Sequence, residues 1–236
     1  MSKILLSGYY GFNNFGDDLF PYVASLNFSD VDLYILSPRI KGVEGVRFLV
    51  PEVLSGIYKA NGFFSRLLRM VFMVYGAFLT DHVVLAGGSV LASGSSNRMR
   101  RLQYFLCLFG VCKLSVVGVS VGPFTKEEDI VFYKKFSRRL SNFFVRDMKS
   151  YNVTLELLVV EPNFYGDIVG ALPVAKPSNK FVKEPRVARL GVSLCEYPGV
   201  LSAGEAMSCI ERSNYNEILD GVAKFCHARR MSESII

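Results

Sequence analysis

Short apolar runs that end in glycine recur along this chain, and they constrain its fold more than any other feature. Residues 4–6 lead into a glycine-containing turn at 8–18, residues 82–86 into one at 87–89, and residues 114–119 into one at 118–123. Strands that are apolar without alternation are typical of a parallel sheet covered on both faces. Each turn alone is an ordinary strand-to-helix turn. Because the carboxyl ends of parallel strands share one edge, we expect the three turns together to line one ligand crevice.

Strand-like and helix-like segments alternate along the chain, which predicts an α/β fold with a Rossmann-like parallel sheet and helices on both faces. The predicted strands are residues 3–7, 32–36, 46–50, 82–86, 114–119, 142–145 and 155–160; the predicted helices are 17–26, 64–79, 97–110 and 126–140. Thr125 and Glu128 match a capping box at the start of the last helix. Its residues at helical spacing, Ile130, Tyr133, Phe136 and Leu140, should face the sheet.

A change in composition near residue 173 predicts a domain boundary. Residues 173–186 contain three prolines and several basic residues, which is typical of a linker. A new strand is expected at 187–194 and a helix at 216–229. We therefore predict a first domain at 1–172, a linker at 173–186, and at 187–236 the truncated start of a second Rossmann-like domain, because so short a segment falls below the ~100–150 residues of a typical domain.

Charge and cysteine content exclude several classes of protein. The net charge of +6 suits an anionic ligand or an anionic membrane surface. No basic run is interleaved with aromatic residues, which disfavours nucleic acid. The five cysteines form no C-x-x-C pair, so neither structural zinc nor a disulfide framework is expected, and the simplest location is the cytoplasm. Residues 67–79, interrupted by Arg69, are too short to span a bilayer and indicate a buried or surface-adherent helix.

Five motifs occur in an order that points to one family. They are GYYGFNNFGDD (8–18), AGGSVL (86–91), GVSVGP (118–123), VRDMKS (145–150) and RLGVSL (189–194), with Asp167 before the expected linker. The first is close to the opening G-Y-Y-G-x-x-N-x-G-D-[DE] signature of polysaccharide pyruvyl transferases. The second differs from that family's G-G-G-S-[LI]-[LI] turn by Ala86 in place of the first glycine. Over residues 3 to about 195 the chain resembles this family.

The resemblance implies a two-lobed fold like that of GT-B glycosyltransferases, with an incomplete second lobe here. It also implies transfer of pyruvate from phosphoenolpyruvate to two hydroxyls of a sugar, as a cyclic ketal, in the biosynthesis of a surface polysaccharide. The partners would be phosphoenolpyruvate and a saccharide or lipid-linked saccharide acceptor, and no metal or other cofactor is expected. Contact with the inner face of a membrane and formation of a homo-oligomer are left open.

The chemistry of this reaction selects the candidate site residues. A donor that carries a phosphate and a carboxylate needs cations and N–H groups, for which Arg146 is the best candidate; a structural ion pair with Asp147 is the alternative. Asp17 and Asp18 are candidates for the catalytic base or for orienting sugar hydroxyls, although Asp17 also suits a helix cap. The expected substrate-binding residues are Gly11, Asn13, Asn14, Gly16, Gly87, Gly88, Ser89, Ser120, Gly122, Arg146 and Asp167.

Several of these residues have a second interpretation. Asn13 and Asn14 suit the shape of the turn, and Asp167 suits a contact between lobes or a helix cap. His82 opens a strand and is interpreted as structural. Two other functions stay open: a non-catalytic remnant that binds an anionic sugar or polysaccharide machinery, and a GT-B glycosyltransferase that uses a nucleotide sugar. Phosphate release from phosphoenolpyruvate would separate an enzyme from a remnant, and stabilisation by a nucleotide diphosphate would indicate a glycosyltransferase.

Overall fold

The computed structural model describes residues 2–28, 30–88, 91–93, 97–168, 189–192 and 232–235. The chain separates into two compact units, residues 1–178 and 179–236. In the second unit, β8 (Arg189–Val192) pairs in parallel with β9 (Ser232–Ile235). The strand β8 lies within the segment predicted at 187–194. The linker predicted at 173–186 and the helix predicted at 216–229 lie outside the described residues.

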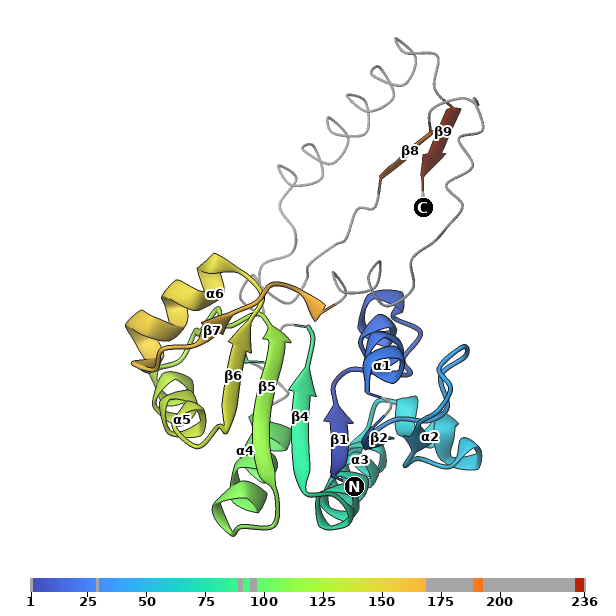
Figure 1. Cartoon of the computed structure of the whole chain (residues 1–236), viewed down its shortest axis with the longest axis horizontal. Coiled ribbons are helices and arrows are strands. Elements are labelled where there is room, and N and C mark those ends of the chain that lie inside the picture. Colours follow the sequence, from blue (N-terminus) through green and yellow to red (C-terminus); the bar gives the residue numbers. More distant parts are fainter. Residues whose placement is uncertain are drawn as a thin grey trace. The chain divides into compact units, whose positions relative to one another are not determined.

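The first unit is built on one seven-stranded sheet, in which all neighbouring strands are parallel (Figure 1). Its strands are β1 (Lys3–Ser7), β2 (Asp32–Ile35), β3 (Arg47–Phe48), β4 (His82–Ala86), β5 (Lys113–Val119), β6 (Asn142–Val145) and β7 (Asn163–Phe164). Their order in the sheet is β3-β2-β1-β4-β5-β6-β7. The chain therefore winds outward from β1 in both directions, which is the Rossmann-like α/β arrangement that the sequence predicted.

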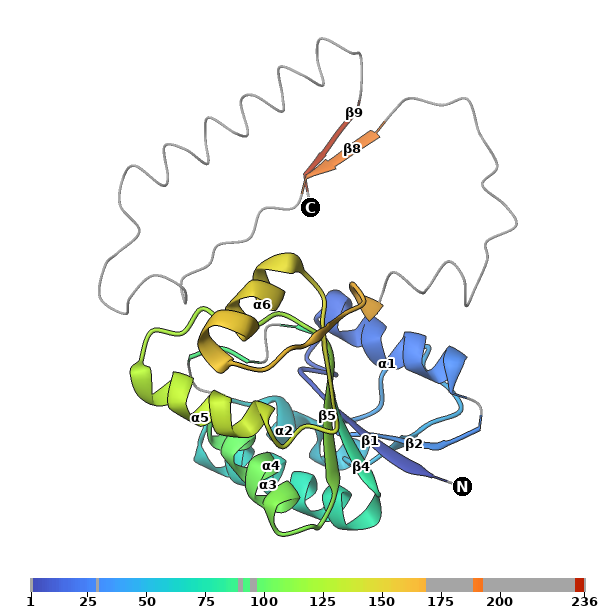
Figure 2. The same ribbon diagram turned by 60° about the vertical axis from the view of Figure 1, so that its left-hand side comes forward.

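The helices cover both faces of this sheet (Figure 2). They are α1 (Phe15–Asn27), α2 (Ser55–Lys59), α3 (Phe63–Leu79), α4 (Asn97–Leu108), α5 (Glu127–Ser137) and α6 (Met148–Val153), with a 3₁₀ turn at Glu52–Leu54 and a π-helical turn at Thr154–Leu158. Phe20 and Ala24 of α1 pack in one core cluster with Leu33 and Ile35. The helices α3, α4 and α5 contribute to a second cluster on the other face. No helix in the described ranges has the length and apolar content that a membrane crossing requires.

Small residues allow α3 to pack closely on the sheet. Met73 and Ala77 are fully buried, and Gly76 lies between them on the inner side of the helix. A Cβ atom at Gly76 would lie 2.6 Å from a methyl group of Leu49 and 2.7 Å from one of Leu5, so a larger residue would have to displace these two leucine side chains. Burial of a side chain the size of Met73 contributes roughly 1.5–3 kcal/mol. The inner side of α3 therefore anchors the helix firmly on the sheet.

The strand predicted at 155–160 is wrong. The chain there continues α6 through the π-helical turn Thr154–Leu158, and the last strand of the sheet, β7, begins only at Asn163. The buried residues in this region, Ser150, Thr154 and Leu158, are four apart, which is a helical spacing. Leucine and β-branched residues suggested a strand, but the spacing of the buried positions decides the structure.

The capping box predicted at Thr125 and Glu128 is also wrong. The N-cap of α5 is Lys126, and no side chain caps this helix. The backbone N–H of Thr125 instead donates to Ser93 Oγ at 3.0 Å, which ties the turn after β5 to the turn after β4. Further along α5, Tyr133 and Phe136 are fully buried against the sheet, as their spacing predicted.

Candidate active site

The turns that follow β1, β4, β5 and β6 lie side by side, because these four strands are consecutive in the sheet and parallel (Figure 1). Winding changes direction between β1 and β4, and open α/β sheets bind ligands at the carboxyl edge beside such a point. The turns at 8–18, 87–88 and 118–123 are thus neighbours at one edge, as the sequence predicted. We call this the carboxyl edge. Ser89 of the second turn lies outside the described residues.

Tyr10 joins the first turn to the end of β4. Its ring is buried, and its hydroxyl donates a 2.6 Å hydrogen bond to the carbonyl oxygen of Ala86. Burial and the negative charge of Asp17 raise the pKa of this hydroxyl, so it stays protonated and remains a donor. The ring of Tyr10 occupies the space where a Cβ atom at Gly8 would lie. The first glycine of the signature is therefore needed to seat the tyrosine.

The start of α1 fixes the two candidate catalytic carboxylates. Asn14 is the N-cap of the helix, so the alternative that Asp17 caps it is wrong. Asp18 Oδ1 accepts a 2.6 Å hydrogen bond from the backbone N–H of Gly11, and Asp17 Oδ2 accepts one of 2.6 Å from Asn14 Nδ2. Asp18 thus holds the backbone of the turn. Asp17 accepts its hydrogen bond from an exposed side-chain amide rather than from the backbone, which leaves it the more available of the two.

The pKa of the Asp17 carboxyl lies above its ordinary value. Partial burial is the largest cause, and the neighbouring charge of Asp18 adds to it, while the positive charge of Arg146 acts in the opposite direction. Asp17 follows β1 and Arg146 follows β6, so both lie at the carboxyl edge. A carboxylate of raised pKa is a better proton acceptor than an ordinary one, which suits a general base.

Backbone hydrogen bonds join the second and third turns. The N–H of Ser120 donates to the carbonyl oxygen of Gly88 at 3.1 Å, and the N–H of Gly122 donates to that of Leu91 at 2.7 Å. Gly87 has a φ of +73°, and a Cβ atom there would overlap the ring of Phe20 from α1. A side chain at position 87 would therefore separate α1 from the end of β4. The glycine keeps the first two turns in contact.

Arg146 lies at the centre of the polar cluster at the end of β6. Its Nε donates a 2.6 Å hydrogen bond to Ser120 Oγ, and Ser120 Oγ in turn donates to Asp147 Oδ2 at 2.9 Å. The guanidinium also lies 3.7 Å from Asp147 Oδ2 and 3.6 Å from Asp167 Oδ2. Its side chain is about one-third exposed, at 31%. The structure therefore brings together Ser120, Arg146 and Asp167, three of the residues expected to bind substrate.

Asp147 is the residue that makes this arrangement rigid. It is the N-cap of α6, and its Oδ1 accepts a 2.7 Å hydrogen bond from the N–H of Ser150. Burial alone would raise the pKa of Asp147, but hydrogen bonds from Ser150 and Ser120 and the charge of Arg146 outweigh it and lower the pKa. The Asp147 carboxylate therefore stays ionised and holds Arg146 in place, so the structural role weighed for this pair is present.

Arg100 is a buried cation that the sequence analysis missed. It lies on α4, is 6% exposed, and its Nη1 donates to Gln103 Oε1 at 2.7 Å. Gln103 Nε2 donates to the hydroxyl of Ser7, the last residue of β1, at 3.1 Å. Positions 100, 103 and 106 of α4 are buried at helical spacing, so they form the inward-facing side of the helix. Two polar residues on that side, Arg100 and Gln103, were the sequence pattern that could have indicated a buried polar contact. The positive charge of Arg100 also opposes the rise in the pKa of the Tyr10 hydroxyl.

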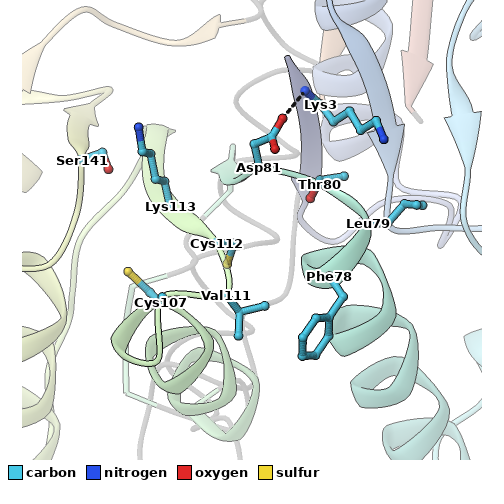
Figure 3. Close-up of a pocket in the computed structure, with 11 residues that line it drawn as sticks. Lys3, Phe78, Leu79, Thr80, Asp81, Cys107, Val111, Cys112, Lys113 and Ser141 are labelled. Atoms are coloured by element: carbon cyan, nitrogen blue, oxygen red, sulfur yellow. Dashed lines mark hydrogen bonds between the residues drawn. The ribbon is translucent and has the colours of Figure 1, made fainter. Parts of the chain in front are cut away.

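A pocket of about 780 Å³ lies at the opposite edge of the sheet, where the strands begin (Figure 3). Its polar lining includes Lys3, Asp81 and Lys113, and the backbone N–H of Lys3 donates to Asp81 Oδ2 at 2.9 Å. His82 is near this edge and contacts Ser115 Oγ at 2.8 Å, which supports its structural interpretation. The cavity expected between the glycine turns remains a prediction, because parts of the second turn lie outside the described residues.

Within the described ranges, no group of three or more His, Cys, Asp or Glu side chains is arranged to hold a metal ion.

The sequence matches the family model of polysaccharide pyruvyl transferase over residues 9–223, which is most of the chain. The chain belongs to the polysaccharide pyruvyl transferase family. The family description implies a saccharide acceptor and a pyruvate donor. No curated protein and no solved structure shows significant similarity to this chain.

The match to the pyruvyl transferase family extends further than the motifs identified by inspection. Those motifs end near residue 195, whereas the matched region ends at 223 and so includes much of the second unit. Four of the five motifs lie in the first unit and follow β1, β4, β5 and β6. The family signature is therefore concentrated at the carboxyl edge of the sheet.

Proposed function

We propose that this protein transfers pyruvate from phosphoenolpyruvate to two hydroxyls of a saccharide, forming a cyclic ketal and releasing phosphate. The family match over residues 9–223 carries the proposal. The position of the family motifs supports it further, because the turns that contain them are neighbours at the carboxyl edge. We further propose that residues 187–236 are the start of the second Rossmann-like domain of a GT-B-like arrangement.

The donor binds at Arg146 in this proposal. A guanidinium presents N–H donors in a planar fork that matches a carboxylate or phosphate. Ser120 and Asp147 hold the fork in place before the donor arrives, which reduces the cost of ordering it. Asp167 is about half-exposed and competes for the same guanidinium at 3.6 Å. Binding of phosphoenolpyruvate therefore displaces or weakens the Arg146–Asp167 contact.

Asp17 is the base in this proposal. It accepts a proton from the attacking hydroxyl, for which its raised pKa suits it, while Asp18 keeps the turn in shape. The first hydroxyl forms a bond to C2 of phosphoenolpyruvate, and C3 gains a proton and becomes a methyl group. The second hydroxyl then replaces the phosphate at C2. One hydroxyl proton is balanced by the proton gained at C3, and the other leaves with phosphate.

Binding of phosphoenolpyruvate to the full chain tests the donor site. We expect phosphoenolpyruvate to raise the unfolding temperature, because a ligand that binds only the folded state stabilises it by mass action. Arg146→Ala should weaken binding about 10- to 100-fold, since a charge-assisted hydrogen bond contributes about 1.5–3 kcal/mol. Asp167→Asn should tighten binding, because it removes a competing charge. If Asp167→Asn instead weakens binding as much as Arg146→Ala, the pair is only structural.

Phosphate release with lipid-linked saccharide fractions as acceptors tests the reaction. We expect Asp17→Asn to abolish release while phosphoenolpyruvate still binds, and Asp32→Asn, at the start of β2 and away from the carboxyl edge, to retain release as the matched control. Binding without release by the unaltered protein would indicate a non-catalytic remnant. Stabilisation by a uridine or guanosine diphosphate sugar, with none by phosphoenolpyruvate, would indicate a glycosyltransferase.

A further inference from the structure

The outward side of α3 is apolar along its whole length. Its exposed side chains include Phe64, Leu67, Val71, Tyr75 and Phe78, which recur every three or four residues and so lie along one side of the helix. Phe64 is 77% exposed and Phe78 is 71% exposed. The opposite side of α3 is buried against the sheet. A surface helix normally presents polar residues to water, so this exposed stripe is unusual.

The neighbouring helix α4 extends the stripe. Figures 1 and 2 both show α3 and α4 side by side, and the helices contact each other. Phe105 and Leu108 at the end of α4, and Phe109 just after it, are exposed, with Phe109 at 79%. We call the exposed apolar residues of the two helices the α3–α4 face. Its apolar residues are grouped together, whereas those of an ordinary surface are scattered singly. Contiguous apolar patches of this kind mark interaction sites.

The segment that carries this face is also strongly basic. Residues 53–126 contain eight Lys and Arg residues and a single acidic residue, Asp81. The whole chain has a net charge of +6, so this segment accounts for all of the excess. Arg66 on α3 and Arg98 on α4 are exposed beside the apolar residues. An apolar helix side flanked by cations is typical of helices that lie in the interface of an anionic bilayer.

The charge of the α3–α4 face disfavours two alternative partners for it, a second copy of the chain and residues 179–236. A symmetric dimer through the α3–α4 face would bring the exposed Arg66 and Arg98 of both copies together, with no acidic residue on α3 or α4 to offset them, and like charges across an interface oppose association. Residues 179–236 contain eight Lys and Arg residues and seven acidic ones, so they offer no acidic surplus to match the face. An anionic lipid surface satisfies both properties of the face, because its acyl region takes the aromatic side chains and its headgroups take the cations.

We propose that the α3–α4 face docks the protein on an anionic membrane surface, with α3 lying parallel to the bilayer plane. The inner side of α3, including Met73 and Ala77, stays on the sheet, so only the outer side enters the interface. Each cation near the surface strengthens binding roughly fivefold, so attraction should weaken as salt is added. This proposal rests on the exposed side chains and the charge of the segment and does not depend on the proposed reaction.

Single tryptophans inserted into the full chain test the proposal, because the sequence contains none. Phe78→Trp places the probe on the α3–α4 face, and Phe28→Trp places one at the end of α1, on the other side of the sheet. With vesicles of phosphatidylcholine and phosphatidylglycerol, Phe78→Trp emission should shift to shorter wavelength and be quenched by brominated acyl chains. Phe28→Trp emission should not change. Vesicles of phosphatidylcholine alone should bind at least tenfold more weakly.

Charge-reversed variants provide the second measurement. Arg66→Glu with Arg98→Glu should weaken vesicle binding at least tenfold, whereas Arg39→Glu with Lys41→Glu, on the α1 side, should have little effect. The proposal is overturned if the Phe78→Trp emission is already at short wavelength without vesicles and does not change on adding them. That result would mean protein covers the face, and light scattering would then separate a dimer from coverage within one chain. Equal binding to neutral and anionic vesicles would also overturn it.

Discussion

Removing the hydroxyl of Tyr10 tests how the carboxyl edge is held together. The Tyr10 side chain is 1% exposed, and its hydroxyl donates to the carbonyl oxygen of Ala86 at 2.6 Å. Tyr10→Phe keeps the ring but removes this bond and leaves a buried carbonyl oxygen with one partner fewer. The expected loss is about 1–3 kcal/mol, because an unsatisfied buried acceptor adds its desolvation cost to the lost bond. A loss of 2 kcal/mol lowers the unfolding temperature of a protein of this size by about 4–8 °C.

Tyr9→Phe is the matched control for this prediction. Tyr9 is the preceding residue, is 53% exposed, and stacks on Phe12 with ring centroids 4.1 Å apart. Removing its hydroxyl should change the free energy of unfolding by less than about 0.5 kcal/mol, as is usual for surface substitutions. Urea unfolding followed by far-ultraviolet circular dichroism measures both variants. If Tyr10→Phe and Tyr9→Phe have the same unfolding midpoint, the Tyr10–Ala86 bond does not hold the first turn to β4.

Substitutions at three further residues test the contacts and charges of the site. Gly87→Ala should destabilise the protein by at least 2 kcal/mol more than Gly45→Ala. Both glycines have a similar positive φ, but only a Cβ atom at position 87 would overlap a ring, that of Phe20. Equal losses of stability in urea unfolding would refute this prediction. Asp147→Ala should cost about 1–2 kcal/mol by removing the cap of α6, and Asp147→Asn less than half of that. The lowered pKa of Asp147 means that its stabilising effect is present above pH 3.8 and is lost as the pH falls through the folded-state pKa, so the two losses should shrink in acid. Asp17→Asn should raise the unfolding temperature at pH 7, because a pKa raised by folding means that the ionised Asp17 carboxylate destabilises the folded state. This gain in unfolding temperature should disappear as the pH falls through the raised pKa towards 3.8. A gain that does not depend on pH would contradict the prediction.

The sequence predicted the elements whose apolar residues follow directly from burial within the sheet or against it. The bounds of β1, β4 and β6 agree residue for residue with the prediction, because these strands are continuous apolar runs next to glycine or polar residues. The helix α3 was placed to within one residue for the same reason. The short helix α2 (Ser55–Lys59) was not predicted, since five residues are too few to show a helical period.

The neighbourhood of the candidate site followed from the strand order, but its internal contacts did not. The turns after β1, β4 and β5 were expected to be neighbours, which parallel strand ends require. The Tyr10–Ala86 bond joins residues 76 apart in the sequence, and no local pattern indicates it. Likewise, the sequence left Arg146 and Asp147 as either an anion site or an ion pair. The structure shows the ion pair and the cap, and anion binding remains a proposal.

Hydrogen–deuterium exchange of the full chain with and without phosphoenolpyruvate tests most directly whether the carboxyl edge binds the donor. The account predicts slower exchange of backbone amides at residues 8–18, 118–123 and 146–147, and no change around the pocket at the opposite edge, which includes Thr80, Val111 and Lys113. Slower exchange confined to that pocket, with none at the carboxyl edge, would contradict the account.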